Sequence, residues 1–240
     1  MPMLENAVLV VAHPDDEVLW FGSILREVGK VIIAFRDYAG VPGLGERRTT
    51  AMAELPYASL TCLGIAEAGS LKRANWGDPT TTEFGLALDE AAEHSETRLH
   101  YERNFATLRA ALAGALTADI DVFTHNPWGE YGHEDHVQVY RVVERLQQSI
   151  GFRLWTSNYC SNRSATLASR YHIDDRPVKR LPIDRAFAGR VARIYQRHDC
   201  WTWARDWVWP DEDCFLPGPL QLAAGQSVTD ARLRFVISEL

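Results

Sequence analysis

Two short stretches of the chain contain residues whose types and spacing suit metal chemistry. The first is His13-Pro14-Asp15-Asp16-Glu17, which directly follows an apolar run over residues 7–12. The run is typical of a strand buried on both faces, and Pro14 ends it. Three adjacent acids beside a histidine repel one another unless a cation or several hydrogen bonds neutralise them. One interpretation is a metal site; the other is a helix N-terminus, where acids favour the macrodipole.

The second stretch runs from His125 to His136 and follows another apolar run, residues 120–124. His133 and His136 are three residues apart, so on a helix they share one face. Zinc in hydrolases commonly takes three protein ligands and leaves one position for water. His13, one of Asp15 and Asp16, and one or both of the later histidines would make such a set. Because both stretches follow a strand, they can be neighbours at the carboxyl edge of a parallel sheet.

Together, the two stretches resemble the signatures of a known family. Residues 12–17 resemble the motif AHPDDE of the PIG-L/LmbE-like zinc-dependent de-N-acetylases, and residues 131–136 resemble the family's second motif, Y-G-H-x-D-H. The motifs occur in the family's order, and the resemblance covers roughly residues 5–160. Glu134 stands where the second motif often has proline. We expect this side chain to point outward, without consequence for a metal ligand.

The resemblance implies a set of metal ligands. It implies a zinc ion held by His13, Asp16 and His136, a choice that spacing alone does not make between Asp15 and Asp16. Fe(II) also suits a set of histidines and a carboxylate. His125 follows a strand but precedes the motif loop, so we expect it to make a structural hydrogen bond.

The resemblance also implies the catalytic residues of an amide hydrolase. Asp15 would act as the base that deprotonates the attacking water. His133 would stabilise the oxyanion or protonate the departing amine. Asp135 would orient His133 and hold its tautomer, as carboxylates next to catalytic histidines do. Tyr131 would donate a hydrogen bond to the tetrahedral intermediate, with ordinary loop packing as the alternative.

The substrate implied by the resemblance is a small N-acetylated amino sugar or its conjugate. The family often carries a substrate-binding arginine near Arg47 and Arg48, although a solvent-facing pair is an equal alternative. Asn158 and Tyr159 follow a further apolar run, and we expect them to meet sugar hydroxyls. Alternative functions are an amidase for another acyl amide and a non-catalytic metal-binding module. The presence of a base argues against the latter. A phosphoesterase with two metals would need more ligands than the chain offers.

Strand and helix patterns alternate along the chain and predict an α/β fold. We expect a Rossmann-like, mostly parallel sheet with helices on both faces. The expected strands cover residues 7–12, 30–35, 61–65, 120–124, 152–156 and 178–182. The expected helices cover residues 16–29, 46–55, 86–116, 133–148 and 184–197. We expect one domain over residues 1–240, with a C-terminal cap or extension from about residue 160.

Composition narrows the partners and the compartment. The formal net charge of −7 argues against a general nucleic-acid-binding protein, which would show a basic face. We find no signal-peptide pattern and no apolar run approaching the ~18 residues of a membrane span. We therefore expect a cytoplasmic protein without a membrane anchor; a homo-oligomer stays open. Four tryptophans between residues 201 and 209 indicate core or domain packing, with stacking on a sugar as the alternative.

Overall fold

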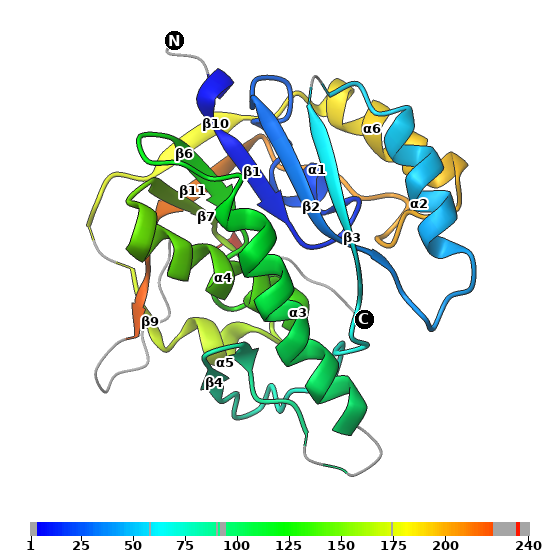
Figure 1. Ribbon diagram of the computed structural model, residues 1–240. Coiled ribbons are helices and arrows are strands. Elements are labelled where there is room, and N and C mark those ends of the chain that lie inside the picture. Colours follow the sequence, from blue (N-terminus) through cyan, green and yellow to red (C-terminus); the bar gives the residue numbers. More distant parts are fainter. Residues whose placement is uncertain are drawn as a thin grey trace.

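The protein is built on a seven-stranded sheet with the strand order β10-β11-β7-β6-β1-β2-β3 (Figure 1). The computed structural model describes residues 4–57, 59–89, 91, 95–173, 175–222 and 234–235. The sheet strands are β1 (Val8–Val11), β2 (Lys30–Asp37), β3 (Leu60–Ala66), β6 (Asp121–Thr124), β7 (Arg153–Ser157), β10 (Lys179–Pro182) and β11 (Glu212–Pro217). The five strands from β7 to β3 pair in parallel, and β11 and β10 add two antiparallel pairs. The prediction of a mostly parallel sheet is confirmed.

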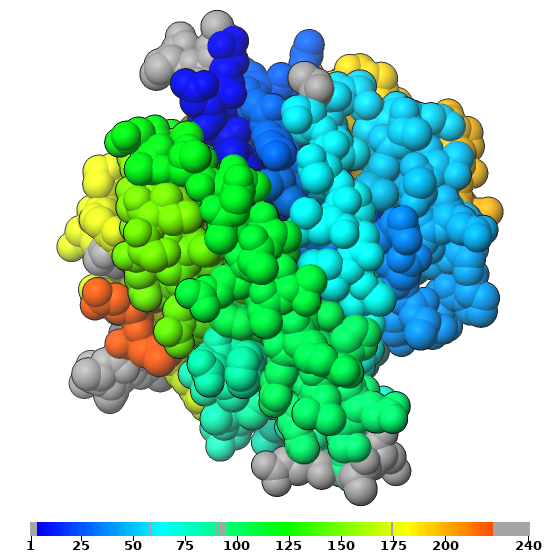
Figure 2. Space-filling model, viewed as in Figure 1, coloured from blue at the N-terminus to red at the C-terminus, as the bar shows by residue number. Residues whose placement is uncertain are grey.

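Helices cover both faces of this sheet. On one face lie α3 (Ser95–Ala113) and α4 (Glu134–Ile150); on the other lie α1 (Asp16–Trp20), α2 (Leu44–Ala53) and α6 (Arg185–Arg197) (Figure 1). In the space-filling view, α3 and the segments beside it cover much of the sheet (Figure 2). Alternate residues of β1 enter different cores: Leu9 joins the cluster with α6, and Val10 joins the cluster with α3 and α4. This double burial explains the unbroken apolar run.

Short elements complete the described chain. They are a 3-10 helix (Leu4–Asn6), β4 (Thr81–Thr82), β5 (Gly85–Leu86), β8 (Tyr159–Cys160), α5 (Ala165–Ala168), β9 (Tyr171–His172), β12 (Gln221–Leu222) and β13 (Arg234–Phe235). The short strands pair outside the main sheet: β4 pairs with β5, β9 with β12 and β8 with β13. Within the described residues, no helix is both long and apolar enough to cross a membrane.

The direction in which strands are added reverses between β1 and β6. The chain runs from β1 to β2 and β3 towards one edge, and then returns to place β6 and β7 on the other side of β1. Ligands of open α/β sheets bind in the crevice at such a reversal, beyond the carboxyl ends of the strands. His13 and His125 follow β1 and β6, so the topology brings both motifs to this crevice.

Three features of the fold differ from the prediction. The helix expected over residues 16–29 ends at Trp20, because the amide of Ser23 donates to the Asp213 carboxylate at 2.9 Å and the chain continues as turns. The helix expected from residue 86 begins at Ser95, because Gly85 and Leu86 pair with β4. Strand β11 was not predicted. The other expected elements are present, with bounds within two residues.

Candidate functional site

The two motifs meet at the crevice, as the sequence predicts. The rings of His13 and His136 lie 5.4 Å apart between centroids, and the rings of His133 and His136 stack at 4.9 Å. All three histidines are buried. Two segments about 120 residues apart in the sequence therefore supply one cluster of imidazoles.

One carboxylate oxygen of Asp16 lies at the centre of this cluster. Oδ2 is 3.2 Å from His13 Nδ1 and 3.2 Å from His136 Nε2, and it also accepts the backbone amide of His13 at 2.7 Å. Burial alone would raise the pKa of Asp16, but the imidazoles around it hold that pKa well below its usual range. One ligand atom from each of the three residues lies within 4.8 Å of the others, so a single ion can contact all three.

The orientation of His136 is what a metal ligand requires. Its Nδ1 contacts Glu130 Oε2 at 2.8 Å, which leaves Nε2 to face Asp16. This Nε2 is buried, and among the residues that the structure describes it has no hydrogen-bond partner, only the 3.2 Å approach of Asp16 Oδ2. A buried polar atom without a partner is costly, and a carboxylate that holds the far nitrogen is the usual companion of a metal-bound histidine. These residues therefore fit a metal ion.

Glu130, which the sequence reasoning missed, holds both neighbouring histidines. Its Oε2 also lies 3.0 Å from His125 Nδ1. Burial would raise the pKa of Glu130, but the two imidazoles outweigh this effect and lower that pKa to about 2. His125 Nε2 accepts the amide of Ala12 at 2.9 Å, so the structural hydrogen bond expected for His125 is confirmed. The signal was the presence of a carboxylate inside the motif loop itself.

Within the described part of the chain, two other groups of side chains have comparable spacing, but their atoms are engaged in hydrogen bonds. In the group of His125, Glu130 and His136, both nitrogens of His125 are engaged. In the group of His13, His133 and Asp135, the carboxylate accepts a hydrogen bond from Ser70 at 2.7 Å. The group of His13, Asp16 and His136 has the free nitrogen and is the better metal site.

Asp15 makes different contacts from Asp16. Its Oδ2 accepts two hydrogen bonds from Thr202, from the backbone amide at 2.7 Å and from the hydroxyl at 2.8 Å. Burial and the neighbouring Asp16 raise the pKa of Asp15 to about 7. A carboxylate with such a pKa can accept a proton near neutral pH. Sequence spacing left the two aspartates interchangeable, whereas their surroundings differ.

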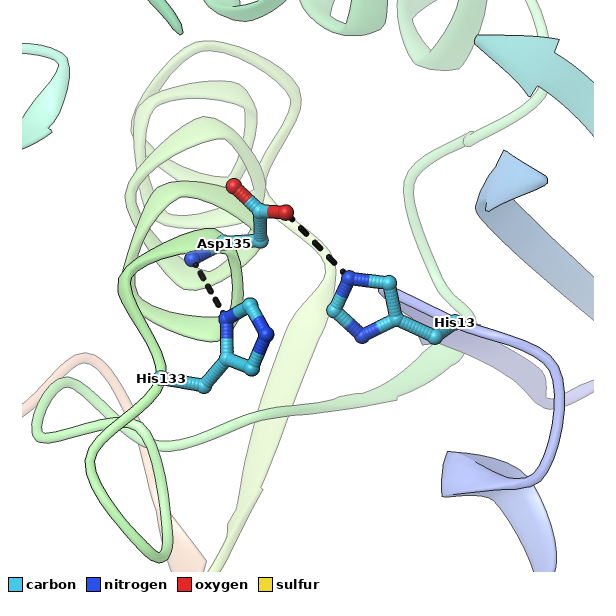
Figure 3. Close-up of side chains that lie close together, drawn as sticks. All are labelled: His13, His133 and Asp135. Atoms are coloured by element: carbon cyan, nitrogen blue, oxygen red, sulfur yellow. Dashed lines mark hydrogen bonds and ion pairs between the residues drawn. The ribbon is translucent and has the colours of Figure 1, made fainter. Parts of the chain in front are cut away.

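His133 and Asp135 touch, but not through the groups that we expected. The backbone amide of Asp135 donates to His133 Nδ1 at 3.1 Å, while the Asp135 carboxylate lies 3.2 Å from His13 Nε2 (Figure 3). The capping bond leaves Nε2 of neutral His133 as a donor. Burial and the neighbouring imidazoles keep the pKa of His133 well below its usual range. His133 is thus oriented by the backbone amide of Asp135 at the N-terminus of α4, whereas the Asp135 carboxylate contacts His13.

A cavity of about 270 Å³ opens beside this cluster. Its wall includes His13, His133, Tyr131, Arg48, Lys72, Arg163, Thr202 and Trp203. The half-buried ring of Tyr131 lies 5.2 Å from that of His136 and 4.9 Å from that of Trp203. Desolvation and nearby carboxylates keep the pKa of Tyr131 well above its usual range, so its phenol is a donor.

The residues expected to bind substrate separate into two sets. Arg48 is buried on the cavity wall and donates to Glu67 at 2.7 Å, whereas Arg47 is bonded to the carbonyl of Asp199 and does not line the cavity. Asn158 and Tyr159 are also absent from the wall. The Tyr159 hydroxyl donates to Asp213 at 2.7 Å inside the core.

The prediction that Glu134 points outward is wrong. Its side chain is fully buried and accepts four N–H groups of one segment, which we call the rim loop (Ser70–Trp76). The donors are the amides of Lys72, Arg73 and Ala74 and the indole of Trp76, at 2.9–3.2 Å. Lys72 has a left-handed backbone with φ of 64°. The rim loop lines the cavity because Glu134 collects its donors.

Comparison with known proteins gives the family. A model of the PIG-L family, described as GlcNAc-PI de-N-acetylase, matches residues 8–146, which is more than half of the chain. The chain belongs to the PIG-L family. Both motifs lie within the matched residues, and so do the three side chains that fit a metal ion.

Individual relatives share part of the chain. A 1D-myo-inositol 2-acetamido-2-deoxy-alpha-D-glucopyranoside deacetylase of Mycobacteroides abscessus is 31% identical over 182 residues, which cover 68% of this chain and 63% of the relative. The enzyme of the same name from Mycobacterium sp. (strain KMS) is 30% identical, with 64% of this chain and 55% of the relative covered. The chain thus spans less than two thirds of the length of these relatives.

Solved structures show the same fold. A deacetylase–bog complex from the biosynthesis pathway of teicoplanin matches with a TM-score of 0.54 at 13% identity, covering 92% of this chain and all of the other. A zinc-inhibited form of a teicoplanin deacetylase matches with a TM-score of 0.52 at the same identity and coverage. At this identity the likeness describes the fold.

Part of the PIG-L site of this chain lies outside the segment that the family model matches. Arg163, Thr202 and Trp203 line the cavity, and all three follow residue 146. The segment around Trp203 packs on Trp20 of α1, with ring centroids 5.2 Å apart. The tryptophan cluster therefore packs against the core, as expected, and one of its members also reaches the cavity.

Proposed function

We propose that this protein is a zinc-dependent N-deacetylase that hydrolyses the acetamido group of an amino sugar or amino-sugar conjugate. The observation that carries the proposal is the buried Nε2 of His136: it lies 3.2 Å from Asp16 Oδ2, accepts or donates no hydrogen bond within the described residues, and belongs to a ring held in place by Glu130. Membership of the PIG-L family supports the reaction type. The relatives named above are deacetylases of a 2-acetamido sugar.

His13, Asp16 and His136 would hold the metal ion. When bound, zinc supplies the Lewis acid and the activated water that amide hydrolysis needs, and Fe(II) suits the same donors. Zinc is our choice because two imidazoles and one carboxylate with an open position form its common hydrolytic set.

The protein's own groups would move the protons. Asp15 accepts the proton of the attacking water, since its pKa, raised to about 7, lies near neutral pH. His133 presents Nε2–H to the oxyanion, and the phenol of Tyr131, which also lines the cavity, is a second donor. Asp135 steadies His13 through its carboxylate and His133 through its backbone amide. Arg48 on the wall is positioned to contact substrate hydroxyls.

A conjugate is a better substrate than a free sugar for the space available. Next to the cavity lies a second one of about 460 Å³, and the two share Tyr38, Val41, Leu44, Glu67 and Gly69 as lining. An acetamido sugar at the histidines would leave room there for its aglycone. The relative from Mycobacteroides abscessus, whose name includes an inositol, supports this choice.

The test compares Asp15→Asn with Asp16→Asn in zinc content and in acetate released from N-acetylglucosamine conjugates. Asparagine tolerates the left-handed backbone of Asp15 and keeps an acceptor for Thr202. We expect Asp15→Asn to retain zinc and lose about 10²–10⁴-fold in kcat, the usual worth of a general base. Asp16→Asn should lose zinc. Wild-type protein that binds zinc but releases no acetate would refute the proposed reaction, and reversed zinc contents would exchange the two roles.

A further inference from the structure

The segment after α6 reaches the proposed base from a distance of 187 residues in the sequence. Thr202 lies on the cavity wall, and both its backbone amide and its hydroxyl donate to Asp15. Both hydrogen bonds fall on the same oxygen, Oδ2. Among the residues that the structure describes, none donates a hydrogen bond to Oδ1.

The backbone of Asp15 is strained, and a second residue, Glu17, hydrogen-bonds to its amide. Its φ is 96°, in the left-handed region that non-glycine residues seldom adopt. Its amide donates to Glu17 Oε2 at 2.9 Å, and Glu17 in turn accepts the hydroxyl of Tyr195 at 2.6 Å. Strained residues persist where the surroundings over-determine them. Glu17 fixes the backbone of Asp15, and Thr202 fixes its side chain.

Aromatic packing keeps Thr202 in register. Trp203, the next residue, lies 5.2 Å from the ring of Trp20 and 4.9 Å from that of Tyr131. Trp20 also donates to Asp16 Oδ1 at 3.1 Å. Trp203, the neighbour of Thr202, thus packs on Trp20, which also holds the proposed ligand Asp16.

We propose that Thr202 is a positioning residue that fixes the carboxylate of Asp15 with Oδ1 as the proton-accepting atom. The inference rests on the proposed deacetylase function. Two donors on Oδ2 use its lone pairs, so the proton of the attacking water goes to Oδ1 while the water oxygen bonds to the amide carbon. The proton then passes to the leaving nitrogen as the C–N bond breaks. Thr202 acts through Asp15 and does not touch the reacting atoms.

The experiment compares Thr202→Val with Thr202→Ser. Valine keeps the branched shape and the backbone hydrogen bond but lacks the hydroxyl, whereas serine keeps both donors. We expect Thr202→Val to lose about tenfold in kcat, the worth of one hydrogen bond to a charged group, with KM and zinc content unchanged. Thr202→Ser should recover kcat to within about twofold of wild type. Thr107→Val is the matched control, because it removes a threonine hydroxyl from the exposed surface of α3 and should change nothing.

A crystal structure of Thr202→Val gives a readout that does not depend on activity. We expect the Asp15 carboxylate to rotate away from its wild-type position, while His13 and His136 stay in place. An unmoved carboxylate, or wild-type kcat in the valine variant, overturns the inference. A fall in kcat that serine does not restore also overturns it. Absence of acetate release by the wild type refutes the proposed function instead, and the position of Asp15 still decides the role of Thr202.

Discussion

Glu130 and Glu134 stand four residues apart in the stretch from His125 to His136, and both are buried, yet their surroundings differ. Glu130 faces the imidazoles of His125 and His136, which lower its pKa to about 2 against the effect of burial. Glu134 faces the N–H groups of the rim loop, and burial raises its pKa. The first glutamate fixes the orientation of two imidazoles in the histidine cluster. The second shapes the cavity in which a substrate would lie.

This comparison separates an inner region from an outer one. The inner region comprises the proposed ligands and Glu130, and its contacts join residues of the two motifs. The outer region comprises the rim loop and Glu134, joined across about 60 residues of sequence. If the division is correct, changes in the inner region should alter metal binding, and changes in the outer region should alter substrate binding alone.

The largest effect should follow His136→Ala. This variant removes the proposed ligand nitrogen and the imidazole that lies between Asp16 and Glu130. We expect zinc content and deacetylation to be lost together, because a hydrolytic zinc needs its protein ligands. Metal analysis after dialysis measures the first and acetate release the second. His172→Ala, which removes an exposed histidine on β9, is the control. Full zinc occupancy in His136→Ala would show that His136 is not a metal ligand and that the inner region is wrongly assigned.

A smaller effect on the metal is expected from Glu130→Gln. The amide can still contact His136, but it lacks the negative charge that favours an imidazole poised to bind a cation. Removing such a partner of a metal ligand typically weakens metal affinity about 10–100-fold. Competition titration with a zinc indicator gives this affinity. Glu134→Gln is the matched comparison and should keep wild-type affinity. If both variants lose zinc equally, Glu130 and Glu134 do not differ in their effect on metal binding, contrary to the proposal.

The sequence predicts the inner region better than the outer one. His13, Asp16 and His136 follow strands, and the order of strands around β1 brings them together. The strand-then-motif pattern is therefore enough to predict that these residues meet, and the family motifs indicate which residues they are. Glu130 lies in the same stretch, and its carboxylate is visible in the sequence, but nothing local shows that it is buried between two histidines.

The outer region depends on contacts that no local pattern records. Glu134 meets donors about 60 residues earlier, and Asp15 meets Thr202 almost two hundred residues later. The length of α1 is set in the same way, since Asp213 of β11 takes the Ser23 amide. Only the folded chain shows which backbone N–H groups a buried carboxylate will collect. For that reason the sequence wrongly predicts an outward-facing Glu134 and a helix after Asp16 that is too long.

The smallest effect separates substrate binding from metal chemistry. In Glu134→Gln one side-chain oxygen remains for the three donors on Oε1, but an NH2 group replaces the oxygen that accepts the Lys72 amide at 3.2 Å. Two donors then face each other, and the rim loop should shift at Lys72, which lines the cavity. One lost hydrogen bond is worth about 0.5–1.5 kcal/mol, so we expect KM to rise roughly 2–10-fold. Zinc content and kcat should stay within about twofold of wild type, because the imidazoles and Glu130 are untouched.

Glu27→Gln, at an exposed position, is the matched control. Steady-state kinetics on one N-acetylglucosamine conjugate measures both constants, and a fall in kcat at unchanged KM would show that the rim loop serves the chemical step rather than the substrate.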